Sequence, residues 1–340
     1  MDAPATIAGP AVPAAPGRAP TARRAGPMIR VALHVLVPLA VAVLVYWQVR
    51  DMDLRQVVAL ARGADTRLLA LGVGAAGAAV LTMGFYDVLC FAPALTGPRR
   101  WRLGAMIFAW TNFLTLGPLG GPALRLHFYR KAGLTAAQVA GGVARQYIGF
   151  GAGVGAWLAM ALLPLGDGAP ALAARVAGAL ALAPLGALIA ARLAFRHRRV
   201  AAHRAGARTM ALLGLVGAVD WGFTLVCFLC TAGAAGISLP ASEQLRALML
   251  GHFAGILSFV PGGVGAADAT WLHFMERGGV KAEAAGAAVL LFRLAFYVLP
   301  WVGALLALKL LFAGRSVRAA LGARASGAGV ESRPGTPGQK

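Results

Sequence analysis

The chain has 340 residues, of which 59% are hydrophobic and only 13% are charged, and its mean hydropathy is +0.71. Because an average soluble domain has about 25% charged residues, this composition excludes an ordinary soluble domain and indicates an integral membrane protein. The formal net charge is +20. The Arg residues lie mainly in the tails and in a few connecting loops, which indicates topology signals and contact with anionic lipid rather than nucleic-acid binding.

Apolar segments follow one another along the chain, and several reach the roughly 20 residues that a helix needs to cross the bilayer. They predict an all-α polytopic membrane protein with a retained first span. Residues 1–27, rich in Pro, Ala and Gly, and residues 314–340 are expected to form disordered basic cytoplasmic tails. The predicted apolar segments are 31–49, 68–92, 103–124, 137–165, 171–191, 209–233, 245–276 and 284–313.

The charges of the loops do not fit a topology in which all eight segments cross the membrane. If every segment crossed, the basic loop "RLHFYRK", residues 125–131, would lie outside, against the positive-inside rule. Two segments contain breaks suited to a chain reversal, "GPLGGP" at 117–122 and "PGGVG" at 261–265. If both segments enter the membrane and turn back, the basic loops and both termini lie in the cytoplasm. We therefore expect six full spans and two re-entrant broken hairpins.

This order of elements has an internal symmetry. Residues 68–165 and 209–313 each read as a span, a broken hairpin and a second span, and the two units begin on opposite sides of the membrane. Secondary transporters use such inverted repeats around a site near the midplane, where interrupted helices line a cavity. We expect residues 28–313 to form one transmembrane domain with an inverted repeat.

Three stretches also resemble a known family. "PGGVGAAD", residues 261–268, resembles the P-G-G-x-G-x-x-Glu signature of the lysylphosphatidylglycerol synthase transmembrane (flippase-like) family, with Asp268 where that family usually has Glu. "LFRLAFYVLPWVGALLAL", residues 291–308, resembles its last span. Residues 114–145 resemble its first broken segment, and the likeness covers about residues 30–313.

The resemblance implies translocation of lipid between leaflets rather than lipid synthesis. Family members that make aminoacylated lipids have a large acyltransferase domain after the membrane part, whereas a tail of Arg, Gly and Ser follows residue 313 here. We therefore expect a transporter and no enzyme, in a bacterial plasma membrane. The expected partners are an anionic or zwitterionic phospholipid, aminoacylated in one version of the hypothesis, and a separately encoded lipid synthase or glycosyltransferase.

Ionisable residues inside spans are costly in a membrane and are therefore candidates for function. The break at 261–265 leads into a half-helix whose N-terminus can receive a phosphate. Arginines in or next to spans offer forked donors for a phosphodiester. The predicted substrate-binding residues are Arg125, Arg145, Pro261, Gly262, Gly263, Gly265, Asp268 and Arg293.

Each of these residues also has a structural interpretation. Asp268 can stabilise the start of its own helix, and Arg125 can lie at the cytoplasmic lipid surface. Asp87 and Asp220, on the first spans of the two units, are expected to form ion pairs or relay protons. All six charged groups can also simply hold the helix bundle together.

Two other classes of function stay open. A membrane-embedded enzyme acting on lipid or polyprenyl phosphate needs clustered acids with a metal, or a nucleophile with a base, and no such set appears in the loops. A partner or regulator of a lipid enzyme is the other class. We expect no cofactor and no metal, because no G-x-x-x-x-G-K-[ST] loop occurs and His127, His252 and His273 are isolated.

Overall fold

The computed structural model describes residues 43, 46, 50, 52–91, 95–114, 120–194, 206–258, 260–307 and 309. Within these ranges all regular structure is helical, which confirms the all-α prediction. The two predicted tails, and almost all of the predicted first span at 31–49, lie outside the described residues.

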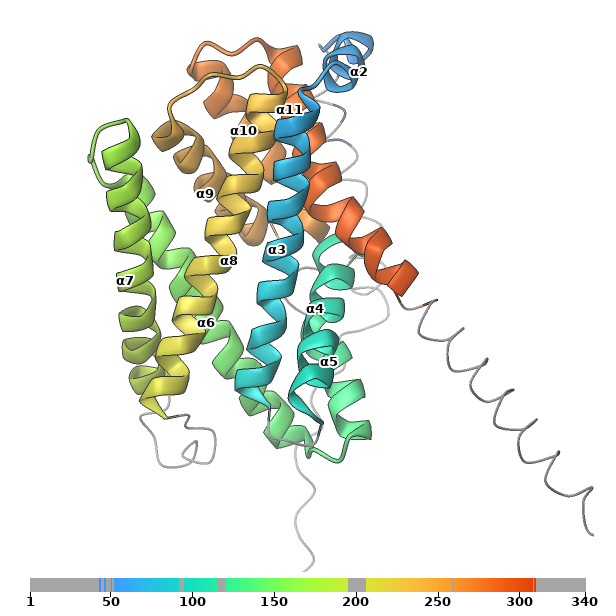
Figure 1. Ribbon diagram of the computed structural model, residues 1–340, viewed down its shortest axis with the longest axis vertical. Helices are drawn as coiled ribbons and strands as arrows, with labels where there is room; N and C mark the ends of the chain where they lie inside the picture. The colour runs from blue at the N-terminus through green and yellow to red at the C-terminus, as the bar shows by residue number, and fades with distance from the viewer. Residues whose placement is uncertain are drawn as a thin grey trace, which may run out of the picture. The chain divides into compact units, whose positions relative to one another are not determined.

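The remaining helices lie close to the predicted apolar segments (Figure 1). After η4 the last helix continues to Ala307, so that Ala282–Ala307 is one apolar rod. Among the described residues, four helices are long and apolar enough to cross a membrane, namely Thr66–Cys90, Ala169–Ala194, Ala207–Ala234 and Ala282–Ala307. The elements are α2 (Leu54–Arg62), α3 (Thr66–Cys90), α4 (Gly97–Leu114), α5 (Gly120–Lys131), α6 (Ala136–Leu162), α7 (Ala169–Ala194), α8 (Ala207–Ala234), α9 (Ala241–Leu257), η3 (Pro261–Gly263), α10 (Ala266–Arg277), α11 (Ala282–Arg293) and η4 (Leu294–Val298).

Capping side chains set the starts of several helices. The carboxylates of Asp53 and Asp65 accept hydrogen bonds from backbone N–H groups in the first turns of α2 and α3. Thr135 and Gln138 form a reciprocal capping box at the start of α6. These contacts satisfy N–H groups that have no partner within the helix, and so they fix where each rod begins.

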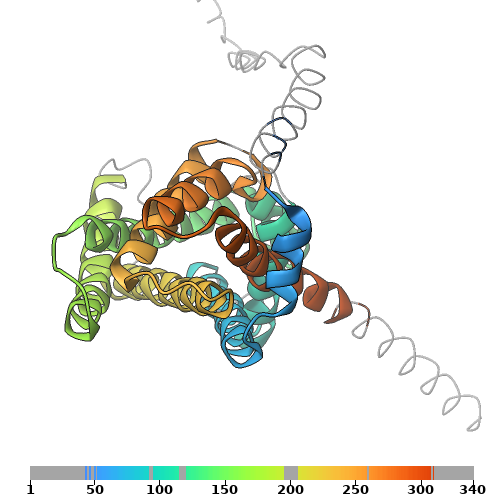
Figure 2. The same cartoon turned by 90° about the horizontal axis from the view of Figure 1, so that it is seen from above.

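Helices α3, α6, α7 and α8 form the scaffold that positions the site. In Figure 2, α8 lies between α7 and α3, and α8 also packs closely on α6. A Cβ atom built on Gly153 of α6 would lie only 2.7 Å from the Cα atom of Gly217 in α8. Any side chain at Gly153 would therefore force the two helices apart, and the glycine pair permits backbone contact without polar side chains.

The predicted segment 103–124 consists of two helices, α4 and α5, on either side of residues 115–119. Both outer ends of this pair contact Phe91, which follows α3. Arg100 near the start of α4 donates to the Phe91 carbonyl at 2.5 Å, and the Tyr129 ring near the end of α5 stacks on the Phe91 ring at 4.1 Å. The chain therefore folds back on itself between α4 and α5.

The predicted segment 245–276 is also two helices, because α9 ends at Leu257 and α10 begins at Ala266. Between them Gly262, Gly263 and Gly265 have φ angles of 63°, 62° and 85°. Only glycine adopts these left-handed values without strain, so this short stretch reverses the chain. Leu239 before α9 lies against Gly278 after α10, which brings the outer ends of the pair together.

The outer ends of the two broken segments lie near opposite ends of α3. The N–H of Asp65, at the start of α3, donates to the carbonyl of Ala234 at the end of α8. Leu239 follows Ala234 closely along the chain and lies against Gly278, whereas Phe91 follows the other end of α3. The pair α4 and α5 thus approaches the interior from the end opposite to α9 and α10 (Figure 1).

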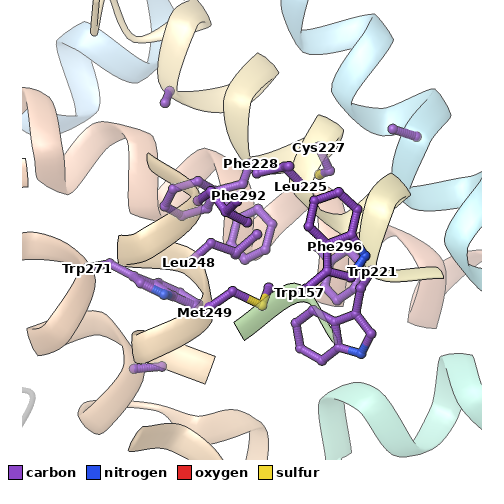
Figure 3. Packing of buried hydrophobic residues seen from close by; sticks show 14 of the residues in the cluster. Trp157, Trp221, Leu225, Cys227, Phe228, Leu248, Met249, Trp271, Phe292 and Phe296 are labelled. Atoms are coloured by element: carbon purple, nitrogen blue, oxygen red, sulfur yellow. The ribbon is translucent and has the colours of Figure 1, made fainter. Parts of the chain in front are cut away.

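A core of aromatic side chains holds the second half of the chain together (Figure 3). The Phe292 ring of α11 meets Phe228 of α8 edge-on at 5.2 Å and Trp271 of α10 at 5.2 Å. Leu248 of α9 packs in the same cluster and is fully buried. This core fixes α9, α10 and α11 against α8 and so holds the break between α9 and α10 in place.

Candidate functional site

A cavity of about 540 Å³ lies where the two broken segments meet. Its wall includes the last turn of α4, the first turns of α5, the inner faces of α6 and α8, the end of α9, and η3 and η4. This volume is in the range of about 300–1,000 Å³ that small-molecule sites occupy. Polar wall residues come from both halves of the chain, and they include Thr111, Asn112, Arg125, Gln146, Asp220, Thr224 and His252.

The two broken segments touch one another at one side of this cavity. Asn112, in the last turn of α4, has its carbonyl oxygen 3.9 Å from a Cβ atom built on Gly262 of the second break. The Asn112 amide Nδ2 also donates to the carbonyl of Phe296 at 3.2 Å. Phe296 lies in η4, a π-helical turn, and such turns often mark functional sites in helices.

Arg125 is the cationic side chain that the structure brings to the cavity wall. Its Nε donates to Asp87 Oδ1 at 2.8 Å, and the Tyr129 hydroxyl donates to Asp87 Oδ2 at 3.0 Å. The exposed fractions of the two charged side chains are 6% for Arg125 and 0% for Asp87. The Arg125 Nη2 atom is buried and has no hydrogen-bond partner among the described residues. Asp87 itself does not line the cavity.

Arg293 and Asp268 form a second ion pair, which holds the break rather than facing the cavity. Arg293 Nε donates to Asp268 Oδ1 at 2.8 Å, and its Nη1 donates to the Gly262 carbonyl at 2.5 Å. Asp268 Oδ2 accepts from the Gly265 N–H at 2.8 Å, which caps the start of α10. The Arg293 guanidinium also lies over the Trp271 ring. In this structure Asp268 thus stabilises the start of its own helix, as its structural interpretation predicted.

The other predicted site residues also fall into two groups, those that line the cavity and those that do not. Arg145 donates to the Cys90 carbonyl at the end of α3 and is absent from the cavity wall. Gly262 and Gly263 line the cavity, Pro261 opens η3, and Gly265 precedes α10 without reaching the wall. Arg125, Gly262, Gly263 and Asp220 thus line the same cavity. Arg145, Asp268 and Arg293 are not part of its wall.

Asp220 of α8 differs from Asp87 and Asp268, because no cation forms an ion pair with it within the described chain. Its exposed fraction is 3%, it lines the cavity, and its Oδ1 atom is buried with no hydrogen-bond partner among those residues. The neighbouring Thr224 hydroxyl donates to the Asp220 backbone carbonyl and not to its side chain.

The cavity reaches the surface of the helix bundle between α6 and α9. Tyr147, Phe253 and Ile256 line it while 41%, 42% and 43% exposed. Gly151 and Gly155 follow Tyr147 at four-residue intervals on α6 and also belong to the wall. No other atom of the described residues lies within 4 Å of a Cβ atom built on either glycine, so this edge of the cavity is open in that part of the chain.

Several residues of the cavity wall were not predicted from the sequence. Asn112, Gln146 and His252 were not among the predicted contacts, although each is a polar residue within a predicted apolar segment. Arg175 was also missed. It is 1% exposed on α7 and donates to the carbonyls of Met160, Leu163 and Gly166, so it caps the end of α6. A basic residue five positions into the predicted span 171–191 was the available signal.

Comparison with known proteins identifies the family. Residues 30–306 match the family described as the lysylphosphatidylglycerol synthase TM region. The chain belongs to this family. A curated relative, the "Phosphatidylglycerol lysyltransferase" of Bacillus subtilis (strain 168), is 24% identical over 291 residues. That match covers 79% of this chain and 33% of the relative, so the chain spans about a third of the length of the curated relative it matches. The expected family membership is confirmed.

Proposed function

We propose that this membrane protein translocates an anionic or zwitterionic phospholipid between leaflets, with the lipid head in the cavity and the acyl chains in the bilayer. The observation that carries the proposal is the buried Arg125 guanidinium on the cavity wall. Its Nη2 atom has no hydrogen-bond partner within the described chain, and Asp87 holds its Nε. A fixed guanidinium with a spare donor suits a phosphate oxygen.

The shape of the cavity supports a substrate with an apolar part. The edge between α6 and α9 combines exposed apolar side chains with Gly151 and Gly155, so that a chain attached to the bound head can leave sideways. A polar head in a water-filled interior with tails in the bilayer avoids dragging a phosphate through hydrocarbon, where charges are costly. The proposal includes no catalytic step, and a separately encoded lipid synthase or glycosyltransferase is the proposed supplier of the lipid.

We also propose a membrane topology. The pairs α4 with α5 and α9 with α10 are re-entrant hairpins that enter from opposite faces, within an inverted repeat of six full spans. The protein lies in a bacterial plasma membrane, and both termini are on its cytoplasmic side. Such a repeat can open the cavity to one face or the other by rocking one unit against its partner. Cysteines placed at the exposed positions 126, 127, 130 and 131 are then labelled from the cytoplasm, and cysteines at the exposed positions 277 and 281 from outside.

Leaflet exchange in proteoliposomes tests the function. The purified protein is expected to accelerate the exchange of a fluorophore-labelled phospholipid, measured by quenching the outer leaflet. Arg125→Lys keeps a cation beside Asp87 but removes the spare Nη donor, so we expect exchange to slow by about tenfold or more, as the loss of one charged hydrogen bond implies. Arg55→Lys on the exposed face of α2 is the matched control and retains the full rate.

Two results would contradict the proposal. One is exchange no faster than in protein-free vesicles across several headgroups. The other is an Arg125→Lys variant that is folded and exchanges lipid as fast as the Arg55→Lys control.

A further inference from the structure

Asp220 stands apart from the charges that hold the fold. Among the described residues the acids Asp87 and Asp268 each meet an arginine at 2.8 Å, and both arginines are thereby engaged. Asp220 lies in the middle of α8, 3% exposed, and its Oδ1 atom has no hydrogen-bond partner in that part of the chain. An enclosed carboxylate in this state is strongly disfavoured, whereas a protonated carboxyl is tolerated far better.

The surroundings of Asp220 contain no compensating cation among the described residues. From α3 the Tyr86 hydroxyl approaches the same stretch of α8, 2.9 Å from a Cβ atom built on Gly217, and it too has no partner there. On the α7 side, Ala183 and Pro184 contact Gly214. On the α11 side, Arg293 is held by Asp268 and Gly262. The titratable and charged groups that share the cavity wall with Asp220 are Arg125 of α5, Tyr147 of α6, His252 of α9 and Tyr297 of η4.

These groups do not neutralise Asp220. Arg125 is bound to Asp87, and His252 makes a contact of 3.1 Å with the Leu248 carbonyl of its own helix through Nδ1. The second ring nitrogen of His252 faces the Tyr297 hydroxyl at 3.4 Å. A proton needs only one carboxylate, whereas a metal cation needs several oxygen ligands at once.

We propose that Asp220 is the proton-coupling site of lipid translocation, taking up one proton from water when the cavity opens to one face and releasing it when the cavity opens to the other. This inference rests on the proposed function and adds its energy source. An O–H bond forms on the Asp220 carboxylate with a proton from bulk water, and the same bond breaks into water on the opposite side. One proton crosses per cycle, and the carboxyl is neutral while it is enclosed in the low-dielectric interior.

The position of Asp220 explains how the proton and the lipid head can share one transition. Asp220 and Arg125 lie on the wall of the same cavity but come from different halves of the chain, α8 and α5. A change in the charge of Asp220 alters the field in the space that holds the head, and a movement that exposes the head to one face also exposes Asp220 to it. Asp87 cannot take this role in the structure because Arg125 and Tyr129 already occupy its two oxygens.

The test measures the steady-state distribution of a labelled phospholipid across proteoliposomes under an imposed pH gradient, with the membrane potential clamped by potassium and valinomycin. With one proton coupled to each lipid, a gradient of one pH unit supports a leaflet ratio of about ten to one. The ratio is expected to invert when the gradient is reversed. Asp220→Asn, which keeps the size of the side chain but cannot exchange the proton, is expected to stay near one to one.

Asp53→Asn is the matched control, because it makes the same change at the N-cap of α2, where Asn caps as well as Asp. It should respond to the gradient as the unchanged protein does. If the unchanged protein exchanges lipid but its leaflet ratio ignores the pH gradient, proton coupling is overturned while lipid transport stands. Proton coupling is also overturned if a sodium gradient, and not a proton gradient, drives the asymmetry. If no exchange occurs, the proposed function itself has failed.

A second readout does not depend on the folding of the Asn variant. A pH-sensitive dye inside the vesicles should report proton movement when a lipid gradient is imposed on the unchanged protein. Proton movement that requires both protein and labelled lipid supports the coupling. Lipid movement without any proton movement overturns it, even if Asp220→Asn cannot be purified.

Discussion

The ion pair between Asp87 and Arg125 yields a quantitative prediction about stability. Asp87 is fully buried, and its oxygens accept hydrogen bonds from Arg125 Nε at 2.8 Å and from the Tyr129 hydroxyl at 3.0 Å. Asp87→Ala removes both acceptors and leaves a buried guanidinium without its counter-charge. Because breaking a buried ion pair from one side is strongly destabilising, we expect the free energy of unfolding to fall by about 3–5 kcal/mol.

A double-mutant cycle separates this effect from the simple loss of side-chain atoms. Arg125→Met should also destabilise the fold, while Asp87→Ala combined with Arg125→Met leaves no unpaired charge. We therefore expect the double variant to lose less than the sum of the two single losses, by about 1–3 kcal/mol. Unfolding free energies can be measured by steric trapping in bicelles.

The control for this cycle is Asp53→Ala, which removes a carboxylate that caps the exposed helix α2 and should cost only about 1 kcal/mol. The stabilising role of the buried pair is refuted if Asp87→Ala lowers the free energy of unfolding no more than Asp53→Ala does. It is also refuted if the two single losses add fully in the double variant, since the charges would then be independent.

Three further outcomes are expected. Arg175→Met leaves three carbonyls at the end of α6 without their donor, so the unfolding free energy should drop by about 3 kcal/mol, and an unchanged melting temperature would disprove this role. Gly153→Leu should prevent close packing against Gly217 and yield little folded protein in size-exclusion chromatography. Gly155→Leu, on the open side of the same helix, should fold normally but slow lipid exchange by narrowing the cavity edge; an undiminished rate would remove that edge from the lipid path.

The sequence predicted the helices well because hydropathy and loop charge act over long stretches. The predicted segment 209–233 corresponds to α8, Ala207–Ala234, and the break at "PGGVG" coincides with the three glycines of positive φ. Proline and glycine restrict or release the backbone locally, so their effect is visible without knowledge of the neighbours.

The partners of the charged side chains were not predictable in the same way. Arg293 and Arg145 were expected to contact the headgroup, yet in the structure they bond to Asp268, Gly262 and Cys90. Helix α8 is apolar on nearly all sides, so its sequence does not show that the face with Asp220 turns toward the cavity. Such pairings depend on contacts between segments far apart in sequence, for example Asn112 with Phe296.

The central claim is that the cavity between the two broken segments holds a lipid head, and photocrosslinking tests it most directly. A phospholipid with a photoreactive group on its head, irradiated in proteoliposomes and mapped by mass spectrometry, should label wall residues near Gln146 and Tyr147 of α6 and Phe253 of α9. Excess unlabelled lipid should compete for these positions. Labelling restricted to outward-facing residues of α7, such as Leu185 and Ile189, with none on the cavity wall, would contradict a lipid head in this cavity.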